Sequence, residues 1–125
     1  MAYSDNDTTF ENRGDLIASD RVEGTTVYNR QGERLGHISN FMVEKRSGQV
    51  RYAVLSFGGF LGLGQDHYPL PWSVLTYDTE KGGYVIDLAK EVLEAAPHYG
   101  VGERPFEDEA YGQSVYRYYG VTYPW

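Results

Sequence analysis

The sequence predicts a mainly all-β protein whose short strands close, or half close, into a small barrel. Three observations lead to this fold class. First, β-rich segments recur about every 8–12 residues between turn sequences rich in glycine, asparagine and proline. Second, the chain has 125 residues, the size of one domain with one modest core. Third, the strand-rich part ends in one short helix candidate, at residues 89–96.

The first three predicted strands are residues 24–28, 34–44 and 50–57. Turn sequences separate them at residues 29–32 and 45–49, and each turn contains a glycine that can adopt a positive φ. Apolar residues lie on both faces of the third strand. This pattern is typical of a central strand that is covered on both sides.

The second strand needs a β-bulge, because its apolar phase slips. Phe41 and Val43 lie at odd positions, whereas Ile38 lies at an even one. One extra residue near positions 39–40 would place all three side chains on one face.

The remaining predicted elements are a hairpin, with strands at residues 75–77 and 83–87, and the helix over 89–96. Residues 67–71 cannot form a central strand, because their two prolines lack the N–H groups that a ladder needs. The side chains expected to be largely buried in the barrel are Val27, Ile38, Phe41, Val43, Val54, Leu55, Trp72, Leu75 and Val85.

Charge and composition exclude several classes of function. Eighteen acidic against eleven basic residues give a net charge of −7, which disfavours direct nucleic-acid binding. The absence of cysteine rules out disulfides and thiolate chemistry. No apolar stretch approaches the ~20 residues of a membrane span, and residues 1–12 lack the pattern of a secretory signal. We therefore expect a cytoplasmic protein without a membrane span.

The order of the turn motifs resembles that of the PRC-barrel family. The motifs are GTTVY at 24–28, GERLGHI at 32–38, GQVRY at 48–52, FGGFLGLG at 57–64 and PLPWSVL at 69–75. The resemblance implies a six-stranded PRC-type β-barrel with no catalytic residues to carry over. Such barrels occur in the H subunit of photosynthetic reaction centres, in a ribosome small-subunit maturation factor and in stand-alone bacterial proteins. Because the chain lacks the membrane helix of the first and the preceding domain of the second, neither function carries over.

Composition divides the chain into three segments. Residues 1–14 are predicted to be a flexible N-terminal arm, and residues 15–97 the PRC-barrel domain. Residues 98–125 form a tail with six of the twelve tyrosines and no leucine or isoleucine, so the tail cannot build its own core. It either packs on its own barrel, binds another subunit or protein, or stays mobile. Within it, residues 112–119 can form helical turns that Gly120 would end.

Two groups of residues are candidates for an interaction surface. One is apolar and lies in the glycine-rich loop, and the other belongs to the aromatic tail, where rings give a large contact area with few rotatable bonds. Tyr116, Tyr119 and Tyr123 recur at spacings that could share one helix face. The candidates are Phe60, Leu61, Leu63, Tyr116, Tyr119, Tyr123 and Trp125.

No catalytic, cofactor or metal site is predicted. The three imidazoles, His37, His67 and His98, match no metal-ligand spacing, and no serine is placed for a hydrolytic set. The glycine-rich loop at residues 58–64 lacks the residues of a nucleotide-binding fingerprint.

The interpretation that follows is a non-enzymatic protein-interaction or assembly module. It would self-associate, with a homodimer favoured, or dock on a partner protein. One alternative is a small-ligand-binding or regulatory domain that uses the barrel mouth near Phe60 and Trp72. A more distant alternative is an RNA-processing or ribosome-associated factor.

Overall fold

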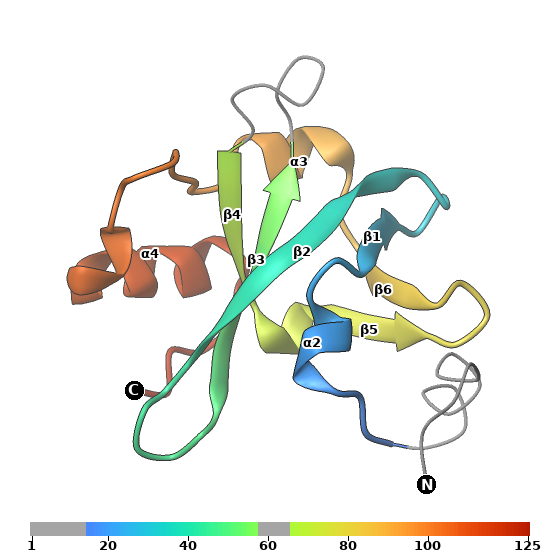
Figure 1. The fold of residues 1–125 in the computed structure, drawn as a ribbon. Helices are drawn as coiled ribbons and strands as arrows, with labels where there is room; N and C mark the ends of the chain where they lie inside the picture. Colours follow the sequence, from blue (N-terminus) through green and yellow to red (C-terminus); the bar gives the residue numbers. More distant parts are fainter. Residues whose placement is uncertain (1–14, 58–65) are drawn as a thin grey trace, which may run out of the picture.

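A six-stranded sheet, in the order β4-β3-β2-β1-β6-β5, dominates the computed structural model, which describes residues 15–57 and 66–125. The sheet curls into a half-barrel, and the long strand β2 runs across the whole molecule (Figure 1). This architecture confirms the predicted fold class. The strands are β1 (Thr26–Asn29), β2 (Arg34–Val43), β3 (Val50–Phe57), β4 (Asp66–Pro71), β5 (Leu75–Asp78) and β6 (Gly83–Ile86).

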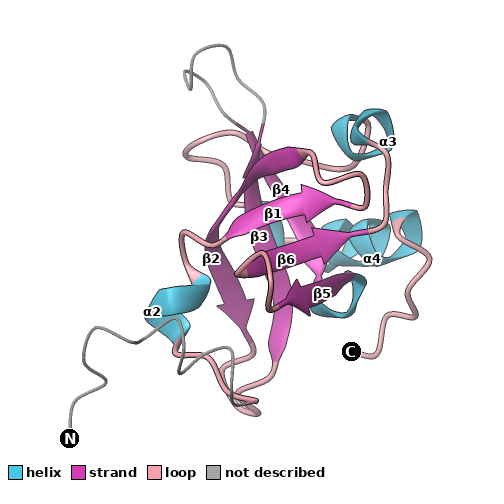
Figure 2. Cartoon of the chain, turned by 90° about the vertical axis from the view of Figure 1, so that its right-hand side faces the viewer, coloured by secondary structure: helices cyan, strands magenta, loops and turns pink. Residues whose placement is uncertain are grey.

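Short helices lie around the sheet (Figure 2). The α-helices are α2 (Ser19–Val22), α3 (Lys90–Glu94) and α4 (Glu109–Tyr118), and two 3-10 turns are η2 (Trp72–Val74) and η3 (Pro105–Glu107). The helix predicted over residues 89–96 is α3, and Leu93 and Ala96 bury their side chains in the barrel core. Helix α4 covers the outer side of β4.

Strand pairing follows the chain, except where the curl brings distant strands together. The pairs β1–β2, β2–β3, β3–β4 and β5–β6 are antiparallel, whereas β1 and β6 pair in parallel. The proline-containing β4 lies at one end of the strand order, as the sequence predicts. Its outer edge receives one bridge, in which the N–H groups of His67 and Tyr99 each donate to the other residue's carbonyl, at 2.8 and 3.0 Å.

The first turn is organised by a buried side chain. Asn29 is 2% exposed, and its Oδ1 accepts hydrogen bonds from the N–H groups of Gln31 and Glu33 at 3.1 and 2.9 Å. Its Nδ2 donates to the Glu33 carboxylate at 2.9 Å. Because every polar atom of this side chain is paired, its burial is compatible with a stable turn.

The predicted bulge in β2 is confirmed, with one correction. The register between β2 and β3 shifts between Ile38 and Asn40, which turns Ile38 fully inward and Phe41 partly into the same core. A second shift lies between Met42 and Val43. The expectation that Val43 is buried is therefore wrong, and this side chain is 45% exposed.

The barrel core fills the inside of the curl. Val27, Val54 and Leu55 are fully buried, as predicted. Trp72, Leu75 and Val85 are only half-buried. The cluster that makes up the core contains Val22, Val27, Leu35, Ile38, Ala53, Leu55, Phe57, Tyr68, Leu70, Tyr84, Ile86, Leu93 and Ala96.

Strand β3 is buried on both faces, as a central strand should be. Residues 52–57 are buried without interruption. Ala53, Leu55 and Phe57 point into the barrel core, whereas Tyr52 belongs to a second cluster outside the curl. That outer cluster is the part of the fold that positions the candidate site.

Leu55→Ala should lower the free energy of unfolding by about 2–5 kcal/mol, because Leu55 is fully buried and its removal leaves a cavity in the core. Val43→Ala is the matched control, since Val43 is 45% exposed and lies outside the core, and it should change stability by less than about 0.5 kcal/mol. Urea unfolding followed by circular dichroism measures both. Equal losses in the two variants would contradict the assignment of the core.

Candidate functional site

Helix α4 brings the last part of the tail onto the barrel. Asp108 caps the helix, its carboxylate accepting a hydrogen bond from the Ala110 N–H at 3.0 Å. The helix ends before Gly120, which has a φ of +71°. The Val121 N–H donates to the Tyr116 carbonyl at 3.0 Å and the Gly120 N–H to the Arg117 carbonyl at 3.1 Å, the two bonds of a Schellman motif. The predicted helical turns and their end at Gly120 are confirmed.

Residues 121–125, here called the strap, leave this turn toward the outer face of β3. Tyr116 is the centre of their contacts. Its ring lies 5.3 Å from that of Tyr123 and 5.7 Å from that of Trp125, both edge to face, and 5.5 Å from that of Tyr52. Its hydroxyl donates to the Arg51 carbonyl at 2.7 Å. The second cluster thus joins α4, the strap and β3.

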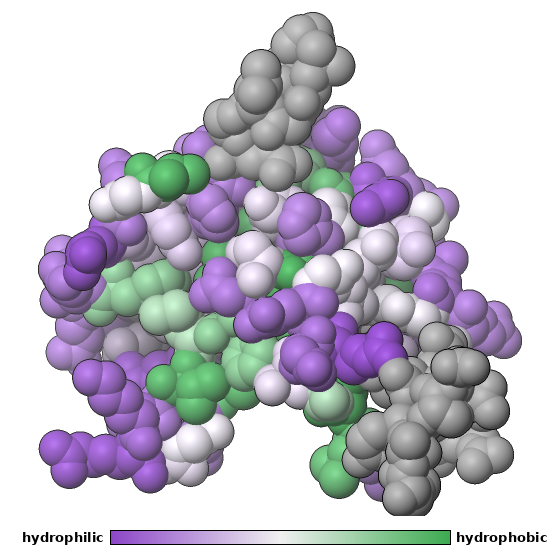
Figure 3. Space-filling view, in the orientation of Figure 1, coloured by the Kyte–Doolittle hydropathy of each residue, from purple (hydrophilic) through white to green (hydrophobic). Residues whose placement is uncertain are grey.

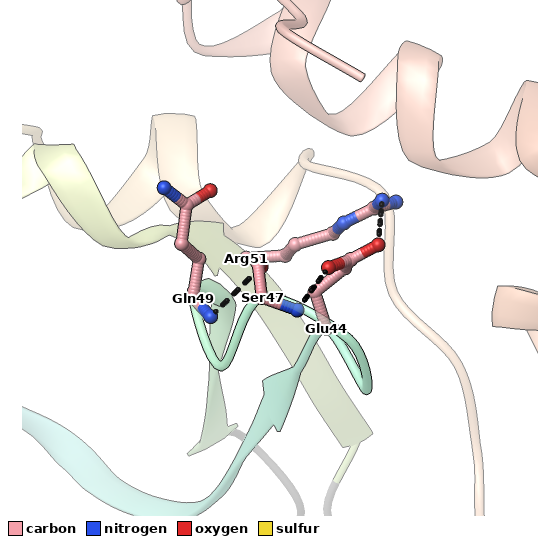
Figure 4. A network of polar contacts seen from close by, with 4 residues as sticks. All are labelled: Glu44, Ser47, Gln49 and Arg51. Carbon is pink, nitrogen blue, oxygen red and sulfur yellow. Dashed lines mark hydrogen bonds and ion pairs between the residues drawn. The ribbon is translucent and has the colours of Figure 1, made fainter.

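Arg51 connects the strap to the hairpin between β2 and β3. Its guanidinium lies 4.3 Å from the centre of the Trp125 ring, a cation–π distance, and 3.5 Å from the Glu44 carboxylate. The other oxygen of Glu44 accepts from the Ser47 N–H at 2.9 Å, and the Ser47 hydroxyl accepts from the Gln49 N–H at 3.1 Å (Figure 4). The hydrogen bonding from Ser47 to the Glu44 carboxylate, together with the Arg51 charge, lowers the pKa of Glu44. The Glu44 carboxylate therefore stabilises the turn through one oxygen and orients Arg51 through the other.

A groove of about 570 Å³ opens between this hairpin, η3, the start of α4 and the strap. We call it the hairpin groove. Its floor is apolar and aromatic and its rim is charged, and Figure 3 shows apolar side chains gathered over the same elements. The lining residues are Met42, Val43, Glu44, Lys45, Arg51, Tyr52, Phe106, Glu107, Asp108, Glu109, Gly112, Tyr123 and Trp125.

Gly112 allows the close approach of α4 to β3 at the end of the groove. A Cβ at this position would overlap the Tyr52 hydroxyl and lie 3.3 Å from that of Tyr123. Glycine normally weakens a helix interior, but here the small residue lets two tyrosine side chains reach the helix backbone. Phe106 completes the floor, with its ring 5.0 Å from that of Tyr52.

The structure places the predicted tail residues inside the chain. Tyr116 is 4% exposed, and Tyr119 packs against both hydrophobic clusters. Tyr123 lies beyond the end of α4, so the expectation that it shares one helix face with Tyr116 and Tyr119 is wrong. It meets Tyr116 because the chain folds back. Trp125 lines the hairpin groove, and in this single chain the tail packs on its own barrel.

Sequence reasoning missed Arg51, Glu44 and Met42 as parts of the site. The one available signal was Arg51 itself, a cation within an otherwise apolar strand. The other predicted candidates, Phe60, Leu61 and Leu63, lie outside the described residues.

Two of the three histidines, His67 and His98, make local contacts near β4, and His37 lies in β2. The Nδ1 atom of His98 lies 2.9 Å from the Ala96 carbonyl, and its Nε2 lies 3.5 Å from the Asp66 carboxylate. His67 stacks on Tyr99 with ring centres 5.3 Å apart. Over residues 15–57 and 66–125, no group of three or more histidine or acidic side chains is arranged to hold a metal ion. In the same ranges, no helix has the length and apolar character needed to cross a membrane.

A second hollow lies beside Trp72, whose ring contacts Tyr84 edge to face at 5.6 Å. It measures about 360 Å³, and none of its lining residues lines the hairpin groove. Its lining consists of Asp15, Leu16, Ile17, Trp72, Leu75, Tyr77 and Tyr84.

Burial dominates the electrostatics of the tail. It raises the pKa of Tyr111 and of Tyr116 to about 12, and it raises the pKa of Tyr52 and Tyr119 as well. The hydroxyls of Tyr111 and Tyr119 are buried without a hydrogen-bond partner in the described part of the chain. Ionising these phenols would place charge where water cannot reach it.

Comparison with known proteins gives a family. The sequence profile of the PRC-barrel domain matches residues 14–93. No curated protein matches the chain significantly. Among solved structures, a putative 16S ribosomal RNA processing protein RimM from Pseudomonas aeruginosa is similar, with 16% sequence identity and a TM-score of 0.40. The match covers 65% of this chain and 49% of that one, so the chain corresponds to about half of that protein.

The free energy of unfolding should fall between pH 10 and 12. Unfolded tyrosine ionises near pH 10, whereas Tyr111 and Tyr116 keep their protons to about pH 12 in the fold, so the unfolded state loses protons first. Tyr116→Phe should make this fall shallower. Urea unfolding at several pH values measures the slope, with Tyr28→Phe, outside the cluster, as control. An unchanged slope in Tyr116→Phe would contradict the burial of this phenol.

Proposed function

This chain belongs to the PRC-barrel family, and we propose that it is a non-enzymatic interaction module that binds a linear segment of a partner protein in the hairpin groove. The observation that carries the proposal is the groove itself. It combines an aromatic floor with a charged rim, and both the barrel and the tail build it. Such a mixture of apolar centre and polar rim is typical of protein-binding surfaces.

The side chains of the groove indicate an apolar segment as the occupant. Val43, 45% exposed, and the neighbouring Met42 line one wall, while Tyr52 and Phe106 line the floor. Methionine and aromatic side chains adapt to varied apolar partners. A volume of about 570 Å³ fits a few side chains rather than the face of a whole domain.

The charge of the rim indicates a basic residue beside that apolar segment. Four carboxylates line the groove against two cations, and Arg51 is already held by Glu44 and the Trp125 ring. Glu109 and Glu107 are exposed on the tail side of the rim. The net charge of −7 would also steer a basic partner toward the protein.

A photo-crosslinking amino acid at position 43 tests this function in cells. It should crosslink one partner, and mass spectrometry should identify the attached segment as apolar with a flanking lysine or arginine. The purified segment should bind the full chain in solution, and Val43→Asp should weaken binding at least about tenfold, because a carboxylate is placed against the apolar side chains.

The same crosslinker at Thr76, an exposed position on β5, is the matched control. Crosslinks at both positions to the same proteins would indicate non-specific contact. Binding of the purified segment that is unaffected by Val43→Asp would also rule out the hairpin groove as its site.

A second candidate function is the binding of a small apolar ligand beside Trp72. The aromatic hollow of about 360 Å³ favours it, because pockets of this size and lining bind small molecules. Native mass spectrometry of the protein purified from its own cells should then show one bound molecule, lost in Trp72→Ala. An unliganded mass in the unaltered protein would contradict this candidate.

A further inference from the structure

We infer that the strap can be exchanged between two copies of the chain, so that each strap seats on the other copy and a two-fold homodimer results. The inference concerns the surface of α4 and β3 on which the strap packs, here called the seat, and not a ligand in the hairpin groove. The two proposals can therefore fail separately. When two copies exchange the same element, both seats are filled and assembly stops at a dimer. The exchange needs no contacts that the single chain does not already make.

The seat is complete without the strap. The groups that receive Tyr123 and Trp125 are the Tyr116 ring on α4 and the Arg51 guanidinium on β3. Neither belongs to the strap. A strap from a second copy would therefore meet the same groups and make the same contacts as the chain's own strap.

Side-chain contacts hold the strap in place. In the described part of the chain, its only backbone hydrogen bond is that from Val121 to the Tyr116 carbonyl, which belongs to the Schellman turn. The ring contacts and the cation–π contact beyond the turn can be broken and remade without disturbing a strand or a helix. Leaving the seat thus costs contacts that a second copy restores.

Gly120 is the hinge that decides between the two arrangements. In the turn it has a φ of +71°, a conformation that glycine adopts readily and most other residues avoid. Glycine is equally able to take an extended conformation, which would direct the strap away from its own barrel. One residue therefore controls whether the strap returns or reaches outward.

The surroundings of the strap leave room for this movement. Trp125 separates two hollows of about 570 and 470 Å³ and lines both of them. Trp125 is half-buried rather than enclosed. Release of the strap needs no opening of α4 or of the barrel.

Hinge variants of the full chain test the exchange. In Gly120→Val, a β-branched residue strains the turn in its closed form, so the dimer dissociation constant should fall by about a hundredfold, roughly tenfold for each of the two hinges. Gly120→Asn is the matched control, because asparagine tolerates positive φ, and it should behave as the unaltered chain. Light scattering over a range of protein concentrations measures the constants, and the unaltered chain should form dimers at the highest concentrations.

Two further variants locate the interface. Trp125→Ala removes the ring from the strap, and Arg51→Ala removes part of the seat. Each change weakens the closed and the exchanged form alike, so each variant alone should dimerise no more tightly than the unaltered chain. Mixed together, they should form a heterodimer by native mass spectrometry, because the strap of one fits the intact seat of the other. Circular dichroism confirms that each variant is folded.

Three results would overturn the inference. The first is an unaltered chain that stays monomeric at every concentration. The second is a Gly120→Val variant with the same dissociation constant as Gly120→Asn. The third is a mixture of Trp125→Ala and Arg51→Ala in which no heterodimer exceeds the homodimers.

Discussion

The two-sided burial of β3 is the constraint on which the rest of the structure depends. A strand at the centre of a curled sheet has its inner face filled by the barrel core, but its outer face would lie in solvent unless another element covered it. Residues 52–57 are apolar or small on both faces and are all buried. The tail covers this outer face at Tyr52, so the barrel and the tail form one folded unit with two hydrophobic clusters that meet at Tyr119.

The chemistry of this cover explains the character of the site. The tail has no leucine or isoleucine, so it covers β3 mainly with rings. The rings of Tyr123 and Trp125 pack edge to face on that of Tyr116. A groove with an aromatic floor remains beside the strap, and Arg51 lies at its margin. The PRC-barrel thus provides the frame, while the segment that follows it shapes the hairpin groove.

Local patterns in the sequence predicted much of the fold. The strand segments, the edge position of the prolines in β4, the bulge beside Asn40 and the end of α4 at Gly120 all depend on near neighbours in the chain. Val43 was misplaced because a second register shift follows the bulge, and alternation counted along one strand does not reveal how the partner strand is aligned. The spacing of Tyr123 suggested a helix face for a similar reason, although the helix ends five residues earlier.

The sequence by itself therefore determined the barrel and a central strand that is buried on both faces. It also determined that the aromatic tail, which cannot build its own core, must pack on some other surface. Only the tertiary structure decided which surface that is. The contact between the Tyr116 hydroxyl and the Arg51 carbonyl joins residues 65 positions apart, and no local pattern encodes such a pairing. It depends on the curl of the sheet, which sets where the outer face of β3 lies, and on the Schellman turn, which aims the strap. The hairpin groove exists only because these two long-range features meet.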